Sequence, residues 1–147
     1  ARLSQSWLGR QLLPIITPRS IIKSSLEQNY ADPKRLSDAA ITRYWELARY
    51  PGNRQATADR ALADREPARW TDIGKIAVPT LIIWGRHDKT IPWQHGKAFA
   101  RAIPKSTLSI IDDAGHLPME ETPDVFVGIL LGWLRSDGQQ GAPEKDS

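Results

Sequence analysis

Two apolar segments near the C-terminal end, each followed by a polar loop, constrain the fold of this chain more than any other feature. The first has its apolar core at Leu81–Trp84 between Pro79 and Gly85, and the second runs from Thr107 to Ile111. Short, unbroken apolar runs of this kind are typical of strands buried on both faces of a parallel sheet. The helix expected between them, beginning near Pro92 and ending before Pro104, makes the pair a right-handed parallel crossover unit.

The loops that follow these two strands carry a carboxylate, Asp88, and an imidazole, His116. Catalytic groups in open parallel sheets gather at the carboxyl ends of the strands. An imidazole between a carboxylate and a hydroxyl acts as a general base, because the carboxylate holds one ring N–H and leaves the other nitrogen free. Each residue also has a purely structural explanation: Asp88 as a turn aspartate that bonds its own backbone, and His116 as a loop or capping histidine.

The motif Trp84-Gly85-x-x-Asp88-x-x-x-Pro92, followed by Gly115-His116 before the last helix, resembles the C-terminal region of the α/β-hydrolase superfamily. The resemblance implies an α/β fold, with Asp88 and His116 as the acid and base of a catalytic triad. The family also carries a Gly-x-Ser-x-Gly nucleophile elbow and a His-Gly segment upstream, and neither precedes the paired motifs here. The chain therefore resembles the C-terminal half of such an enzyme, a helical cap followed by a β-α-β-α unit.

Residues 1–69 resemble the family's helical cap or lid. Helices are expected over about 18–30, from Ser37 or Asp38 to the Pro51-Gly52 stop, and from a capping Asn53 to about Arg65. The C-terminal part of the hydrolase core is expected over 70–135, followed by a disordered tail over 136–147. The last helix of the core is expected to be capped by Thr122 and to face the sheet with Phe126, Ile129, Leu130, Trp133 and Leu134.

Three aromatic residues of the cap region, Trp7, Tyr44 and Trp45, are weak candidates for substrate contacts. The alternative is that they pack helix against helix, because aromatic side chains bury large areas in any core.

Composition excludes several other classes of function. The chain has no cysteine, so disulfides, thiolate metal sites and a cysteine nucleophile are excluded. The spacing of His87, Asp88 and His95 fits no zinc motif, and we expect neither a metal nor a cofactor.

The net charge of +3 comes from cations interspersed with acids, which indicates solvated helix faces rather than a nucleic-acid interface. No membrane span or secretory signal is evident, so a cytoplasmic location is expected.

Two functional hypotheses follow. In the first, the chain supplies Asp88 and His116 to a nucleophile carried by a missing N-terminal half, and the intact enzyme hydrolyses a small-molecule ester or a carbon–carbon bond. The nucleophile is a serine or, as in related enzymes, an aspartate. In the second, the chain is a truncated, non-catalytic module that self-associates or binds a partner through its unpaired sheet edge. Under both hypotheses the chain alone lacks turnover.

Overall fold

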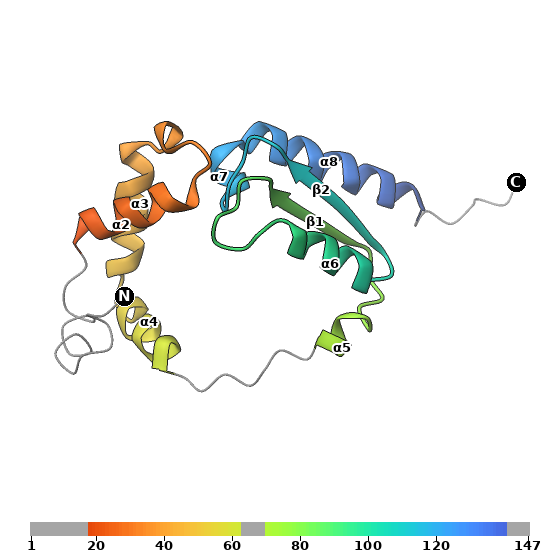
Figure 1. Cartoon of the computed structure of the whole chain (residues 1–147), viewed down its shortest axis with the longest axis horizontal. Helices are drawn as coiled ribbons and strands as arrows, with labels where there is room; N and C mark the ends of the chain where they lie inside the picture. Colours follow the sequence, from red (N-terminus) through yellow and green to blue (C-terminus); the bar gives the residue numbers. More distant parts are fainter. Residues whose placement is uncertain (1–17, 63–69, 141–147) are drawn as a thin grey trace, which may run out of the picture. The chain divides into compact units, whose positions relative to one another are not determined.

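The computed structural model describes residues 18–62 and 70–140, which divide into two compact units (Figure 1). The first unit comprises residues 1–28 and 33–68, and the second comprises residues 29–32 and 69–147. Each is described separately below.

The described part of the first unit is helical, as the sequence predicts. It contains α2 (Arg19–Asn29, whose last residue belongs to the second unit), the 3-10 turn η2 (Pro33–Arg35), α3 (Asp38–Arg49) and α4 (Asn53–Leu62). Ser37 caps α3 because its hydroxyl accepts a hydrogen bond from the Ala40 N–H at 3.1 Å. Leu26, Ala40 and Ile41 are buried.

Asn53 does not have the predicted capping role. It is the first residue of α4, and its side-chain amide donates to the Leu47 carbonyl of α3 at 2.7 Å. Gly52 adopts a φ of 87°, a left-handed conformation that glycine accepts without steric cost. The amide of Asn53 therefore serves the end of α3 instead of the start of α4.

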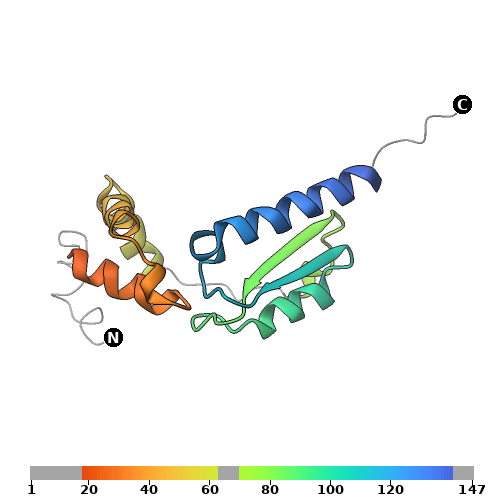
Figure 2. The ribbon, with the colours of Figure 1, turned by 90° about the horizontal axis from the view of Figure 1, so that it is seen from above.

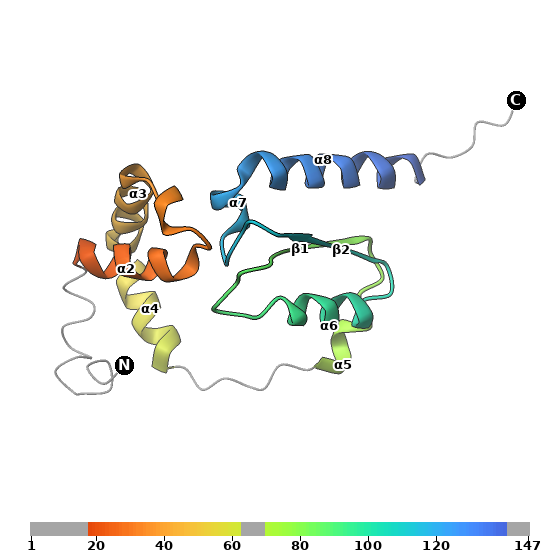
Figure 3. The same ribbon diagram turned by 45° about the horizontal axis from the view of Figure 1, so that its top comes forward.

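The second unit is built on the predicted parallel pair of strands, β1 (Thr80–Gly85) and β2 (Ser106–Ile111), which pair from Thr80↔Ser106 to Gly85↔Ile111. Between them lies α6 (Gln94–Ala102), and α8 (Pro123–Gln140) follows β2. Figure 3 shows the sheet nearly edge-on, with α8 over one face and α6 over the other, and Figure 2 shows the same layers from above. A single-turn helix, α5 (Trp70–Ile73), precedes β1.

The strands are half-buried rather than fully buried for most of their length. Among the described residues each strand has one paired neighbour, so the outer edge of each has no neighbouring strand to cover it. Full burial comes at the carboxyl ends, at Gly85 and Ile111. Ala114, in the loop that follows β2, is fully buried, and Tyr30, another residue of the second unit, is 2% exposed.

The C-terminal helices differ from expectation in three ways. A separate short helix, α7 (Pro118–Glu121), lies between the β2 loop and α8. Leu134, predicted to face the sheet, is 50% exposed, whereas Phe126, Ile129, Leu130 and Trp133 are half-buried as expected. Finally, α8 continues to Gln140, so 136–140 are helical rather than part of a disordered tail. None of the helices in the described ranges combines the length and hydropathy needed to span a membrane.

Candidate active site

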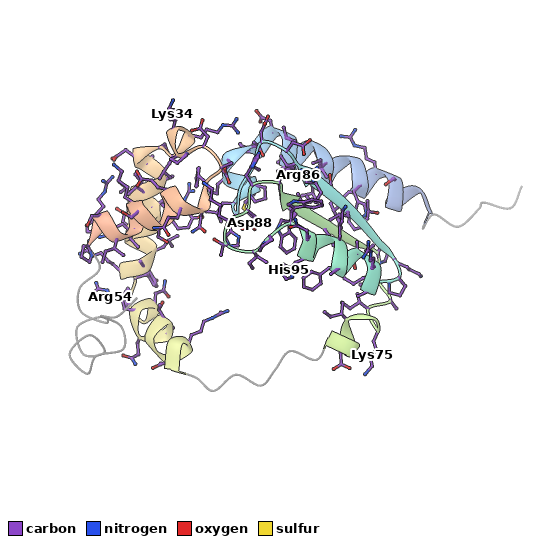
Figure 4. The ribbon with its side chains drawn as sticks, in the orientation of Figure 1. Lys34, Arg54, Lys75, Arg86, Asp88 and His95 are labelled. Atoms are coloured by element: carbon purple, nitrogen blue, oxygen red, sulfur yellow. The ribbon has the colours of Figure 1, made fainter. Side chains whose placement is uncertain are left out.

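Asp88 lies in the loop that leaves the carboxyl end of β1 (Figure 4), and its two carboxylate oxygens have separate partners. Oδ1 accepts hydrogen bonds from the backbone N–H groups of Thr90 and Ile91, both at 2.8 Å. This is the turn geometry that the structural explanation of Asp88 predicts. Oδ2 lies 2.9 Å from Nδ1 of His116. The local turn therefore orients the carboxylate, and the second oxygen holds the imidazole.

His116 follows β2 and the turn at Asp112 and Asp113. Its backbone N–H donates to the carbonyl of Asn29 at 2.8 Å, while its ring meets Asp88. A carboxylate accepts hydrogen bonds and does not donate them, so Nδ1 carries the proton in this pair. Among the described residues no hydrogen bond engages Nε2, which leaves that nitrogen free to accept a proton.

The two members of the pair differ in exposure. The side chain of Asp88 is 4% exposed and that of His116 is 31% exposed. Shielding from water strengthens the interaction between them, whereas the partial exposure of His116 gives a reacting group access to the ring. A buried, fixed carboxylate next to an accessible imidazole is an arrangement that suits general base catalysis.

Glycine permits the two loops to approach each other. A Cβ atom at Gly85 would collide with the carbonyl oxygens of Gly115 and Ala114, so a larger residue at the end of β1 would displace the His116 loop. Backbone hydrogen bonds join the loops at the same place, from Arg86 N to Ile111 O and from His87 N to Ala114 O, both at 2.9 Å. The loop positions are therefore set by backbone contacts.

Glu121 is a site residue that the sequence analysis missed. It is 6% exposed, and its carboxylate accepts hydrogen bonds from the N–H groups of Gly115 at 2.7 Å and Ala31 at 2.6 Å. In the sequence Glu121 directly precedes Thr122, so its position indicates only an acid near a helix terminus. No local pattern marks it as buried, because both donors come from other segments of the chain.

The remaining charged candidates have other partners or lie on the surface. Asp112, in the turn after β2, pairs with Arg86 at 2.8 Å, and the Arg86 guanidinium lies 4.4 Å from the centre of the Trp93 ring. His87 and His95 are exposed. Within the ranges 18–62 and 70–140 no group of three His, Asp or Glu side chains could hold a metal ion.

The aromatic candidates belong to the first unit. Tyr44 lines an open hollow of about 510 Å³ whose wall also includes Ile22, Leu26 and Leu47. The ring of Trp45 faces the guanidinium of Arg49, 4.1 Å from the ring centre. Trp7 lies outside the described residues. Contact with a substrate remains a prediction for all three.

Comparison with known proteins identifies a family. Residues 5–123 match the family described as alpha/beta hydrolase fold. The chain is 28% identical over 133 residues to the uncharacterized hydrolase YugF of Bacillus subtilis, covering 90% of this chain and 44% of that protein. It is 39% identical over 62 residues to the 2-hydroxy-6-oxononadienedioate/2-hydroxy-6-oxononatrienedioate hydrolase of Klebsiella pneumoniae, covering 42% of this chain and 22% of that protein.

Among solved structures, the chain resembles a serine hydrolase involved in carbazole degradation, the CarC enzyme. The TM-score is 0.71 with 26% sequence identity, and the match covers 80% of this chain and 47% of that structure. The chain thus spans less than half the length of the B. subtilis relative and of this solved structure.

Proposed function

Because this chain belongs to the alpha/beta hydrolase fold family, we propose that it is the C-terminal half of a hydrolase in which Asp88 is the acid and His116 the base of a catalytic triad. One observation carries the proposal: Asp88 Oδ2 lies 2.9 Å from His116 Nδ1 at the carboxyl ends of two adjacent parallel strands. Either residue alone would be an ordinary loop residue. Joined in this way, they form two thirds of a nucleophile-base-acid relay.

The proposed mechanism follows from the free ring nitrogen. His116 Nε2 removes the proton from an attacking hydroxyl as that oxygen bonds to the substrate carbonyl carbon, and the ring later returns the proton to the leaving group. Asp88 keeps the proton on Nδ1 and stabilises the imidazolium that forms between these steps. The nucleophile and the donors that stabilise the oxyanion belong to the part of the fold that precedes this chain.

A serine nucleophile is the first choice, supported by the similarity to a protein described as a serine hydrolase. An aspartate nucleophile is the alternative, and in that case His116 would activate water to hydrolyse the covalent intermediate. The pair at Asp88 and His116 would serve either chemistry. The residues of this chain therefore support the reaction class, whereas the nucleophile is part of the proposal.

For the substrate we propose a small-molecule ester. A second candidate is the hydrolysis of a carbon–carbon bond next to a ketone, which is favoured by the similarity to the hydrolase of a 2-hydroxy-6-oxo dienedioate. Both reactions begin with attack on a carbonyl carbon, so both use the same base. The helices within residues 1–69 would act as the cap over the substrate, with Trp7, Tyr44 and Trp45 as the residues to test for contact.

The proposal is tested by joining this chain to the N-terminal half of a relative. A fusion of the N-terminal half of the B. subtilis relative to this chain, checked for folding by circular dichroism, is assayed with p-nitrophenyl esters and with a 2-hydroxy-6-oxo dienedioate. His116→Ala should abolish turnover of whichever substrate is hydrolysed. The matched control is His95→Ala, because His95 is an exposed histidine on α6 and its loss should leave the rate unchanged. Turnover that survives His116→Ala would contradict the proposed role.

A further inference from the structure

We propose that Glu121 is a positioning residue: its carboxylate fixes the turn before His116 and so determines how the imidazole meets Asp88. This inference rests on the proposed role of His116 as the base. Glu121 itself touches neither His116 nor Asp88 through the hydrogen bonds described above, so it would act through the backbone and not on a reacting atom.

The first step of the argument is the burial of Glu121. A carboxylate that leaves water is strongly destabilised unless hydrogen bonds or a cation compensate for the lost hydration. Glu121 is 6% exposed, and across residues 18–62 and 70–140 no ion pair to a cation is found for it. Two backbone N–H groups provide the compensation instead. Such charge-assisted bonds are short and strong, in agreement with distances of 2.7 and 2.6 Å.

The second step is the division of these bonds between two segments. Oε1 accepts from Gly115, in the loop after β2, and Oε2 accepts from Ala31, in the segment that follows α2. Glu121 therefore links the loop after β2 to Ala31, which precedes Glu121 by 90 residues. The link lies inside the second unit, to which residues 29–32 belong. Neither donor belongs to α7, so these bonds differ from ordinary helix capping.

The third step is the position of the linked residue. Gly115 immediately precedes His116, and the His116 N–H donates to the carbonyl of Asn29 at 2.8 Å. Two successive peptide N–H groups are thus held against the same segment, one through Glu121 and one directly. The close fit leaves no space for a side chain, because a Cβ at Gly115 would lie 2.5 Å from the Asn29 oxygen and 2.9 Å from Glu121 Oε1.

This arrangement restrains the backbone from which the His116 ring projects. Without the Glu121 link the Gly115 peptide could rotate, since glycine permits a wide range of backbone angles. The ring would then sample orientations in which Nδ1 no longer faces Asp88. The expected consequence is a loss of the defined Nδ1–H tautomer, which is a property of the site and not of the global fold.

The test measures that property directly in the 147-residue chain by nitrogen-15 NMR of the His116 ring. The wild-type chain should show one tautomer, protonated at Nδ1. In Glu121→Gln an amide NH₂ replaces one acceptor and faces a backbone N–H, so a second tautomer should appear. The Nδ1 proton should also exchange with solvent at least about tenfold faster, because a hydrogen bond at the site is lost.

Two control variants separate positioning from general stabilisation. Glu46→Gln makes the same chemical change at an exposed residue of α3 and should leave the His116 spectrum unchanged. Ile103→Ala removes a core side chain that is 5% exposed, and it should lower the melting temperature without altering the His116 tautomer. A merely structural role for Glu121 predicts instead that Ile103→Ala and Glu121→Gln affect the His116 signal equally, and this result would overturn the proposal.

A measurement on the unaltered chain covers the case in which Glu121→Gln does not fold. The amide protons of Gly115 and Ala31 should both be protected from hydrogen exchange, as expected for N–H groups bonded to a buried carboxylate. Unprotected amides at both positions would refute the link. None of these measurements needs turnover, so they succeed or fail independently of the hydrolase assay. Conversely, a hydrolase that keeps its rate in His116→Ala would refute the proposed function and leave the Glu121 link intact.

Discussion

At the residue scale, the candidate site depends on side chains whose hydrogen-bonding atoms have separate partners. Asp88 uses Oδ1 for its own turn and Oδ2 for His116. The structural and catalytic explanations of Asp88 are thus compatible, because the turn that explains it locally is also what aims the free oxygen. Glu121 divides its oxygens similarly between Gly115 and Ala31. In both cases the carboxylate connects segments that are separate in sequence.

The first prediction concerns Asp88→Asn in the active fusion. The amide keeps the size of the side chain but presents a donor as well as an acceptor, so the protonated Nδ1 of His116 loses its defined partner. We expect kcat to fall about 10³- to 10⁴-fold, measured by steady-state ester hydrolysis. Asp112→Asn, in the exposed pair with Arg86, is the control and should stay within about threefold, since exposed ion pairs contribute little. Equal losses in the two variants would rule out a special role for Asp88.

At the scale of elements, β1, β2 and their loops carry the site, while α6 and α8 cover the two faces of the sheet. The Trp84 indole N–H donates to the Ile91 carbonyl at 3.0 Å, which ties the end of the Asp88 loop back to β1. The two glycines Gly85 and Gly128 differ in the space around them. Gly85 allows the close approach of the two loops, whereas a Cβ added at Gly128 in α8 would meet no neighbouring atom within 4 Å.

The second prediction uses this contrast. Gly128→Ala adds a methyl group to an exposed helix position with space around it, and should raise the free energy of unfolding by about 0.5–1 kcal/mol. Gly85→Ala should lower it by about 1–3 kcal/mol, because the new Cβ meets backbone carbonyls that cannot move aside cheaply. Thermal or urea unfolding of the two variants provides the measurement. A Gly85→Ala chain as stable as the parent would show that the loops do not approach as closely as described.

The third prediction concerns the start of α3. Ser37→Ala removes the hydroxyl that accepts the Ala40 N–H, and should destabilise the helix by about 1 kcal/mol. Ser20→Ala, at an exposed position within α2, is the matched control with no capping bond to lose. Urea unfolding followed by circular dichroism distinguishes the two. If both variants unfolded at the parent's midpoint, the cap would have no measurable effect on stability.

At the scale of the whole molecule, the described site consists of the carboxylate of Asp88 and the imidazole of His116. The chain covers 44% of the B. subtilis relative and 47% of the carbazole-pathway hydrolase. Hydrolysis also requires a nucleophile and oxyanion donors. The isolated chain also exposes apolar side chains on α8. They are 43–51% exposed and belong to Val125, Val127, Leu131 and Leu134. These features support the proposal that the chain functions with additional protein around it.

The fourth prediction is that the purified chain alone does not hydrolyse p-nitrophenyl esters above the rate of free imidazole, because His116 would be an oriented base without a nucleophile.

The mass of the purified chain separates the two functional hypotheses. It is measured by light scattering on the chain alone and on the chain mixed with the N-terminal half of the relative. A 1:1 complex that labels with a serine-reactive probe supports the proposed hydrolase. A homo-oligomer that does not bind the other half supports the self-associating module. Ester hydrolysis by the chain alone that is lost in His116→Ala would refute the view that the site is incomplete.

The fold of this chain could be predicted from local patterns because its elements depend on local physical chemistry. The apolar runs predicted β1 and β2, Ser37 and Pro51 predicted the limits of α3, and the polar loops identified Asp88 and His116. Where the prediction failed, the cause was a contact beyond the local segment. The side-chain amide of Asn53 bonds the Leu47 carbonyl near the end of α3 instead of capping α4.

The sequence by itself therefore determined the family, the order of the helices and strands, and the two residues proposed as acid and base, because periodicity and strand-end motifs are written along the chain. Only the tertiary structure decided that Asp88 and His116 meet at 2.9 Å and that Glu121 is buried between Gly115 and Ala31. Hydrogen bonds between distant segments depend on how the backbone returns to the same place. That return is set by the packing of the whole unit, including the glycine contacts at Gly85 and Gly115, and no local pattern encodes it.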